Sequence, residues 1–420
     1  MDNEDIIMAL KNGNVPAKGA SELCIGREKE IKEFEYLLKK IKEGKGVTKF
    51  VNGDFGTGKS FFLKVLEEMA FDDNFVVSKV TLSRDVPFNK FEIVYRNIVK
   101  TLRCKTGTSL EHIIEKWMTH LQMLAYEQTT DPVKQELIVQ ENIHDDIENA
   151  RKHSNPFATA IENYHKAIKS GDYETAKYAQ AWLRGDANIP FTIKRKFGVK
   201  GDIDRENAFK FLEALAAFVV SVGYSGLVVL IDEAEDIMAL HTKKLRDVAY
   251  DYIRYIYDEC NLENFKFTLF VFAGTPQFFE DMKLGVPSYQ ALDQRIKDAI
   301  KSNYQDLRKP IVLLEGFSKE ELSEMSDKLM DMHNEAFEWD SKQKISPLIN
   351  RIVDIHEENA QLTGGKVTPR IFIRSFLSIL DTVQQNPKEL DTDEKILQLF
   401  EEREIELEEE FEKEFDEDDW

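Results

Sequence analysis

The sequence predicts an α/β fold with a parallel sheet of about five strands, a helical insertion and a C-terminal helical lid. Three observations lead to this prediction. Residues 227–231 form a continuous apolar run, which suits a strand covered on both faces. Residues 47–70 read as a strand, a glycine-rich loop and a helix. From Ser318 onward only helical periodicity appears.

The elements alternate along the chain as a parallel α/β sheet requires. The strands are expected at 47–52, 75–82, 227–231, 267–273 and 310–314, and the helices before residue 316 at 28–41, 60–70, 88–102, 206–222 and 245–259. Residues 104–205 are almost free of strand patterns and rich in polar helix formers. They are expected to form a helical insertion between the second and third strands.

Four segments are expected. Residues 1–20 are turn-rich around Gly13, Pro16 and Gly19, which indicates an N-terminal arm. The α/β core spans 21–315 and the lid spans 316–384, where Ser318 and Glu321 have the spacing of a capping box. Residues 385–420 form an acidic tail, because 401–420 hold thirteen acids against two bases.

Composition limits the possible functions. The formal net charge of −21 argues against a broadly basic surface that coats DNA. No apolar run approaches the roughly 20 residues of a spanning helix, so no membrane partner is expected. The first residues are acidic, unlike a signal peptide, and the three cysteines have no pair spacing. A cytoplasmic protein without disulfides is therefore expected.

The glycine-rich loop carries the strongest chemical signal. Gly53-x4-Gly58-Lys59-Ser60 matches the P-loop pattern, with a strand before it and a helix after it. Backbone N–H groups and the helix N-terminus would bind the phosphates of ATP, Lys59 would reach the β and γ oxygens, and Ser60 would ligate Mg²⁺. The nucleotide-binding residues expected from the loop are Gly53, Asp54, Phe55, Gly56, Thr57, Gly58, Lys59, Ser60 and Phe61. The alternative is a chance glycine-rich turn.

Two carboxylates end the apolar strand at 227–231. Asp232 would hold Mg²⁺ through water, and Glu233 would polarise the attacking water as a general base, work typically worth about 10²–10⁴-fold in rate. The alternative is that the acidic pair caps the next helix. With the P-loop, the pair predicts an ATP phosphohydrolase.

These motifs together resemble those of AAA+ ATPases, particularly the branch that includes the origin-recognition proteins. The segment Ile25-Gly26-Arg27-Glu28 resembles the one that clasps adenine, which implies that Gly26 and Arg27 bind the cofactor. Residues 272–276 resemble the strand end that carries a sensor of the γ-phosphate, here Thr275. Residues 291–295 resemble the segment of the arginine finger, here Arg295, and residues 368–370 resemble a lid-helix start with a second sensor, Arg370.

Alternatives to these three assignments remain open. Arg295 could be an ordinary surface arginine, with Arg308 and Arg246 as competing fingers. Arg370 could only form a helix cap or a salt bridge within the lid, and Arg374 lies one turn away. Thr275 could be a plain turn residue.

A narrower resemblance covers most of the chain. Residues 52–63, 223–226 and 272–279 are similar to BrxD-type ATP-binding proteins of BREX and related bacterial phage-exclusion systems. This resemblance implies a cytoplasmic defence ATPase that works with a helicase or methyltransferase machinery on DNA. The acidic segment of about 35 residues after the lid is expected to be too short for the winged-helix DNA-binding domain of the origin-recognition branch.

Two functions from different classes are therefore weighed. The first is an oligomeric ATPase that acts on or near DNA in phage defence. The second is a nucleotide-gated switch or scaffold that recruits protein partners through residues 104–205. The basic stretch Lys194-Arg195-Lys196, with Lys200, Phe191 and Phe197, could contact phosphate backbones, although a solvated loop is the simpler interpretation.

Overall fold

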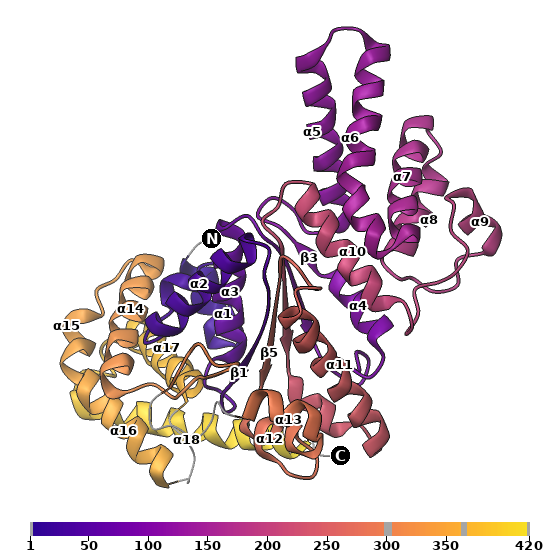
Figure 1. Cartoon of the computed structure of the whole chain (residues 1–420). Coiled ribbons are helices and arrows are strands. Elements are labelled where there is room, and N and C mark those ends of the chain that lie inside the picture. The colour runs from indigo at the N-terminus through magenta and orange to yellow at the C-terminus, as the bar shows by residue number, and fades with distance from the viewer. Residues whose placement is uncertain (1–2, 298–304, 363–367, 418–420) are drawn as a thin grey trace. The chain divides into compact units, whose positions relative to one another are not determined.

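A computed structural model of the whole chain describes residues 3–297, 305–362 and 368–417 (Figure 1). These residues form two compact units. The first comprises 1–31, 53–68 and 313–420, and the second comprises 32–52 and 69–312. Helices α2 (Glu28–Lys42) and α3 (Lys59–Asp72) each have residues in both units.

The first unit is helical. Apart from the starts of α2 and α3, it contains α1 (Asn3–Lys11), η1 (Ser21–Leu23), α14 (Lys319–Phe337), α15 (Lys342–Ile345), η5 (Ser346–Leu348), α16 (Ile349–Leu362), α17 (Pro369–Gln385) and α18 (Asp393–Glu417). Their apolar faces share one core, since Leu322, Phe372 and Phe376 are fully buried with residues of α1 and α18. The expected capping box of Ser318 and Glu321 is confirmed at the start of α14.

The two ends of the chain belong to this helical core. Ile6 and Ile7 of α1 pack with α14 and α17, so part of the segment expected as an arm is a packed helix. Ile396 and Phe400 of α18 are buried in the same core, so the acidic segment begins with an anchored helix. Both segments contain a few apolar residues, but local composition does not show which other helices these residues pack against.

The second unit is built on the sheet. Its strands are β1 (Gly46–Asn52), β2 (Val76–Thr81), β3 (Leu102–Arg103), β4 (Leu227–Asp232), β5 (Thr268–Gly274) and β6 (Ile311–Leu313), whose last residue falls in the first unit. Its helices are α4 (Phe91–Lys100), α5 (Leu110–Gln128), α6 (Pro132–His153), α7 (Asn155–Ser170), α8 (Tyr173–Leu183), α9 (Phe191–Lys196), α10 (Ala208–Ser221), η2 (Ala234–Ala239), α11 (Lys243–Asn261), α12 (Pro276–Glu280), η3 (Val286–Ser288) and α13 (Gln290–Ile296).

The strand order is β3-β2-β4-β5-β1-β6. Strand β2 pairs in parallel with β4, β4 with β5, and β5 with β1, whereas β3 pairs antiparallel with β2. The sheet is therefore mixed and has six described strands, which corrects the expectation of five parallel ones. The extra strand has two residues, Leu102 and Arg103, too few for an alternating pattern, and Leu102 continues the apolar periodicity of the preceding helix.

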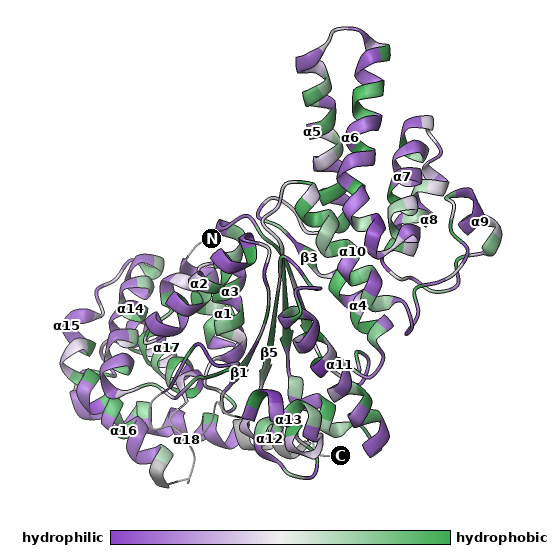
Figure 2. Cartoon of the chain, in the orientation of Figure 1, coloured by the Kyte–Doolittle hydropathy of each residue, from purple (hydrophilic) through white to green (hydrophobic). Residues whose placement is uncertain are grey.

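The helices between β3 and β4 extend the core of the sheet. Figure 1 shows α5 and α6 side by side as a helical pair. Trp117 of α5 and Phe157 of α7 both make edge contacts with Phe218 of α10, at centroid distances of 5.3 and 6.1 Å. In Figure 2 the central strands are hydrophobic, whereas these helices contain both hydrophobic and hydrophilic residues. The residues expected as an insertion thus share one continuous apolar cluster with the sheet.

None of the helices in the described part of the chain combines the length and apolar character needed to cross a membrane.

Candidate functional site

The glycine-rich loop lies in the first unit, directly after the last residue of β1. Gly56 and Gly58 have φ values of +77° and +91°, which favour glycine. A Cβ at Gly53 would lie 2.6 Å from Oγ1 of Thr57, so this position has no room for a side chain. The Thr57 hydroxyl donates to the carbonyl of Asp54 at 2.8 Å. These contacts fold the loop tightly, with α3 beginning at Lys59.

Lys59 is turned back onto this loop. Its ammonium donates to the carbonyl oxygens of Gly53 at 3.0 Å and Asp54 at 3.3 Å, and it lies 4.9 Å from the ring centroid of Phe55. The side chain is buried. Among the described residues, the partners of this buried cation are two carbonyl oxygens and a ring, and such a cation is suited to an anion at the same place.

Ser60 and Phe61 occupy the first turn of α3. Ser60 is half-buried, and Phe61 packs partly buried against the helical core of the first unit. The loop and the helix start therefore supply a small hydroxyl residue near Lys59, which is the residue type that the P-loop pattern uses at a metal.

The segment expected near adenine also belongs to the first unit. Gly26 has a φ of +67°, and a Cβ there would collide with Oε1 of Glu321. Arg27 is buried, donates to the carbonyl of Glu315, and lies over the ring of Phe317 at 5.4 Å. The Arg27 guanidinium thus fixes the chain around the start of the lid.

Arg370 lies in the first turn of α17, also in the first unit. A Cβ placed on Gly56 of the loop would lie 3.0 Å from Cβ of Thr368, the residue before α17. The glycine-rich loop and the start of α17 are therefore neighbours. The guanidinium of Arg370 lies beside Gly13, where an added Cβ would be 2.9 Å from Nε. Thr368 precedes the helix as expected, but its side chain does not accept the capping hydrogen bond.

Asp232 is the last residue of β4, in the second unit. Its carboxylate is buried and pairs through Oδ2 with the ammonium of Lys79 at 3.1 Å, while Oδ1 accepts the backbone N–H of Glu233 at 3.2 Å. Strand β1 ends at Asn52 on the same sheet edge, because β1, β5 and β4 are parallel and in register. Within the second unit, β1 and β4 therefore end at the same edge of the sheet.

Glu233 has a left-handed backbone, with φ 56° and ψ 48°. A non-glycine residue in this region costs about 1–3 kcal/mol and is typical of functional positions. Its side chain is half-buried. The alternative role as a helix cap has little support, because Glu233 makes no side-chain capping bond to η2.

Thr275 follows β5, the strand between β4 and β1. It is fully buried and precedes α12, without a side-chain capping bond. A Cβ on the preceding Gly274 would lie 3.4 Å from Cβ of Ala234, two residues after Asp232. The ends of β4 and β5 are therefore packed against each other.

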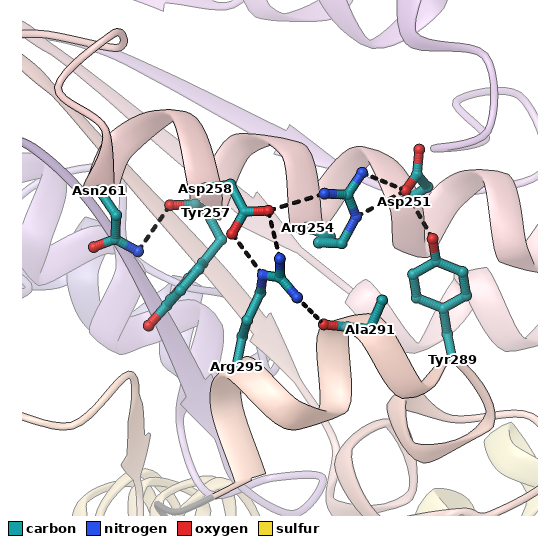
Figure 3. A network of polar contacts seen from close by, with 8 residues as sticks. All are labelled: Asp251, Arg254, Tyr257, Asp258, Asn261, Tyr289, Ala291 and Arg295. Atoms are coloured by element: carbon teal, nitrogen blue, oxygen red, sulfur yellow. Dashed lines mark hydrogen bonds and ion pairs between the residues drawn. The ribbon is translucent and has the colours of Figure 1, made fainter.

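Arg295 lies on α13 and is held by α11 (Figure 3). Its Nε and Nη2 donate to the two carboxylate oxygens of Asp258 at 2.5 and 2.8 Å, and Nη1 donates to the carbonyl of Ala291. Asp258 also accepts from Arg254, which is bound to Asp251. Arg295 is one-third exposed, so the contact is open to solvent.

The competing arginines have different surroundings. Arg246 donates to the carbonyl of Leu240 at 2.7 Å, and Arg308 is exposed. Arg374 donates to the carbonyl of Lys11 at 3.2 Å.

Fewer residues of the basic stretch on α9 are exposed than the sequence suggests. Lys194 is buried and paired with Asp202 at 2.8 Å, and Phe197 belongs to the core. Arg195, Lys196 and Lys200 are exposed.

The expected residues thus fall into two groups. The first unit holds the glycine-rich loop, Gly26 with Arg27, and Arg370, while the second holds Asp232, Glu233, Thr275 and Arg295. Sequence reasoning missed Lys79 and Asp258, the partners of Asp232 and Arg295. The strand pairing of β2 with β4, which brings Lys79 to Asp232, has no local signal in the sequence.

A strand, β1, that leads through a glycine-rich loop into a helix, α3, within an α/β fold is the arrangement expected of a nucleotide-binding protein. The chain belongs to one family of such proteins: residues 1–398 match the family of BREX system ATP-binding proteins BrxC/D. The similarity to BrxD-type proteins expected from the sequence is confirmed, and the chain is an ATP-binding protein of this phage-defence system. No curated protein matches the chain significantly.

Proposed function

We propose that the chain is an AAA+ ATPase that hydrolyses ATP, and that it does so as a homo-oligomer in the cytoplasm. The observation that carries the proposal is the end of β4, where a buried carboxylate at Asp232 precedes a strained Glu233 at the sheet edge from which the glycine-rich loop starts. A protein that only held Mg²⁺ and ATP could use a metal ligand such as Asp232, but it would have no need of a general base such as Glu233.

The residues of the first unit bind the nucleotide in this proposal. The N–H groups of residues 53–61 and the ammonium of Lys59 bind the phosphates. Gly26 and Arg27 border the adenine, and Arg370 is placed at the start of α17, next to the loop. The contact between Gly56 and Thr368 supports this arrangement.

The residues of the second unit act on water and metal. The buried carboxylate of Asp232, already beside one cation at Lys79, fits a divalent cation, and Ser60 offers a hydroxyl ligand. A bound Mg²⁺ would neutralise charge on the phosphates. Glu233 orients and deprotonates the attacking water, Thr275 holds that water in line, and Arg295 acts on the nucleotide of a neighbouring subunit.

The partners follow from the family. As a member of a BREX system, the chain acts with other components of that system, such as a helicase or methyltransferase, and through them on DNA. The net charge of −21 favours contact with DNA through these partners over broad direct coating.

A second candidate is a nucleotide-gated scaffold that recruits proteins through α5 and α6. Tyr126 near the end of α5 and Val133 at the start of α6 are 68% and 70% exposed, and exposed apolar side chains that lie together favour a protein contact. In this alternative ATP is held and rarely turned over.

The decisive experiment measures binding and turnover of labelled ATP with Mg²⁺, with and without single- or double-stranded DNA, alongside molecular size. We expect turnover in the wild type, loss of binding in Lys59→Ala, and retained ATP in an assembled but inactive Glu233→Gln. Slow turnover that is equal in the wild type and Glu233→Gln would refute hydrolysis by this site and favour the scaffold.

A further inference from the structure

The carboxylate proposed to hold the metal already has a cationic partner. The ammonium of Lys79 lies 3.1 Å from Oδ2 of Asp232, whose side chain is 4% exposed. The other oxygen, Oδ1, accepts the N–H of Glu233. Both carboxylate oxygens are therefore engaged within the second unit.

The strand register explains how Lys79 reaches this carboxylate. In the parallel pairing of β2 with β4, Lys79 is opposite Leu230 and Thr81 is opposite Asp232. Side chains two residues apart on a strand point to the same face, so Lys79, Leu230 and Asp232 share one face. The long lysine side chain extends along the strand past Leu230 and ends at Asp232.

The ion pair of Lys79 and Asp232 matters because Asp232 is buried. An ionised carboxylate removed from water is costly unless a cation accompanies it. Lys79 is 29% exposed, so its ammonium can move towards solvent while Asp232 stays buried. A divalent cation near Asp232 would repel the ammonium and replace it as the counter-charge.

We infer that Lys79 is a positioning residue that neutralises Asp232 when no divalent cation is bound and leaves it when one binds. The inference rests on the proposed role of Asp232 in metal binding. Lys79 holds the carboxylate in place, and its competition with the metal sets the Mg²⁺ concentration at which the site fills.

The test uses the full chain with Lys79→Met, which keeps most of the apolar stem and removes the charge. Lys79→Arg, which keeps the charge, is the matched control. The first measurement is the midpoint of thermal unfolding in EDTA and then with added Mg²⁺. The second is the Mg²⁺ concentration that half-saturates the metal-dependent binding of fluorescent ATP.

We expect Lys79→Met to unfold at a lower temperature than the wild type in EDTA and to gain more from Mg²⁺. Its half-saturating Mg²⁺ concentration should fall by about tenfold, since a competing charge is removed. Lys79→Arg should follow the wild type. The double variant Lys79→Met/Asp232→Asn should recover the unfolding midpoint in EDTA, because no buried charge is left unpaired.

The failure of this inference can be distinguished from the failure of the proposed function. If Asp232→Asn binds ATP with the Mg²⁺ dependence of the wild type, the proposed metal role of Asp232 is wrong and the inference falls with it. If Asp232→Asn loses that dependence but Lys79→Met keeps the wild-type half-saturation, the inference alone is wrong. Should Lys79→Met fail to fold, Lys79→Gln replaces it in both measurements with the same criteria.

Discussion

Asp258 on α11 holds the guanidinium of Arg295 on α13 through both of its carboxylate oxygens. Asp258 also accepts from Arg254, so one carboxylate joins two arginines (Figure 3). An arginine in such a planar pair keeps its charge and presents the same fork that would bind phosphate oxygens. A role for Arg295 at a neighbouring nucleotide therefore requires it to exchange Asp258 for phosphate.

Arg295→Ala is expected to lower ATP turnover by about 10³-fold or more, because an arginine supplied in trans typically contributes that much. ATP binding should change little. Mixing Arg295→Ala with Lys59→Ala chains should restore part of the turnover, since each variant supplies what the other lacks. Turnover and labelled-ATP binding at several mixing ratios check this.

Arg254→Ala is the matched control, because it removes an arginine from the same network and leaves Arg295 in place. It should keep turnover near the wild-type value. If both variants lose turnover equally, Arg295 acts only by tying α13 to α11. Mixed oligomers that form but never recover activity would also contradict the trans role.

The strained backbone of Glu233 predicts a conflict between stability and activity. Glycine adopts φ values near +56° freely, so Glu233→Gly should not destabilise the chain and should raise the free energy of unfolding by up to about 1 kcal/mol. Turnover should fall by about 10²–10⁴-fold, since the proposed base is lost. Urea unfolding and an ATPase assay measure the two effects.

Glu338 provides the comparison for this variant. It ends α14 with a φ of 51° and is exposed, far along the chain from the carboxylates of β4. Glu338→Gly should gain similar stability and keep wild-type turnover. A clear loss of stability in Glu233→Gly would show that its side-chain contacts outweigh the backbone strain.

The sequence predicted the framework because its signals are local. The apolar run before Asp232 and the glycine spacing of residues 53–58 each need only a few neighbouring residues. Strand β4 and the start of α3 lie where these patterns place them. The capping box at Ser318 could be predicted in the same way, because it depends on residues three positions apart.

What the sequence did not predict depends on distant pairings. Strand β3 is two residues long and exists through its pairing with β2. The contact of Lys79 with Asp232 joins residues 153 positions apart (232 − 79), and that of Arg295 with Asp258 joins separate helices. Helix α1 joins the C-terminal helices through an apolar face of only three buried residues. No local periodicity encodes these contacts.

The acidic helix α18 is expected to be essential for the stability of the first unit. Glu404 is fully buried and bonds Nδ1 of the buried His356 at 2.7 Å. Removing one partner of a buried pair costs about 3–5 kcal/mol, so Glu404→Ala should lower the free energy of unfolding by that order. Glu401→Ala, an exposed site on the same helix, should stay within about 0.5 kcal/mol of the wild type. Equal effects in the two variants would contradict the anchoring role.

Asp381 on α17 should make the first unit sensitive to acid. Burial opposes its ionisation, but the hydrogen bonds from His333 and Lys11 prevail and hold the pKa of Asp381 below its ordinary value of 3.8. The indole N–H of Trp339 donates to Nδ1 of His333, so Nε2 carries the proton that bonds Asp381. A carboxylate with a depressed pKa stabilises the fold above pH 3.8, and this contribution is lost as the pH falls through the lower folded pKa.

Asp381→Asn should therefore lower stability at neutral pH and reduce the further loss below about pH 4, because an amide has no proton to take up. Urea unfolding between pH 7 and pH 2, followed by far-ultraviolet circular dichroism of the helices, measures both effects. Asp327 is an exposed residue on the helix that carries His333. Asp327→Asn should therefore show the same loss of stability below pH 4 as the wild type. If Asp381→Asn shows the full wild-type loss below pH 4, other carboxylates determine the acid sensitivity, and the network of Asp381, His333 and Lys11 stabilises the helices without being their acid-sensitive point.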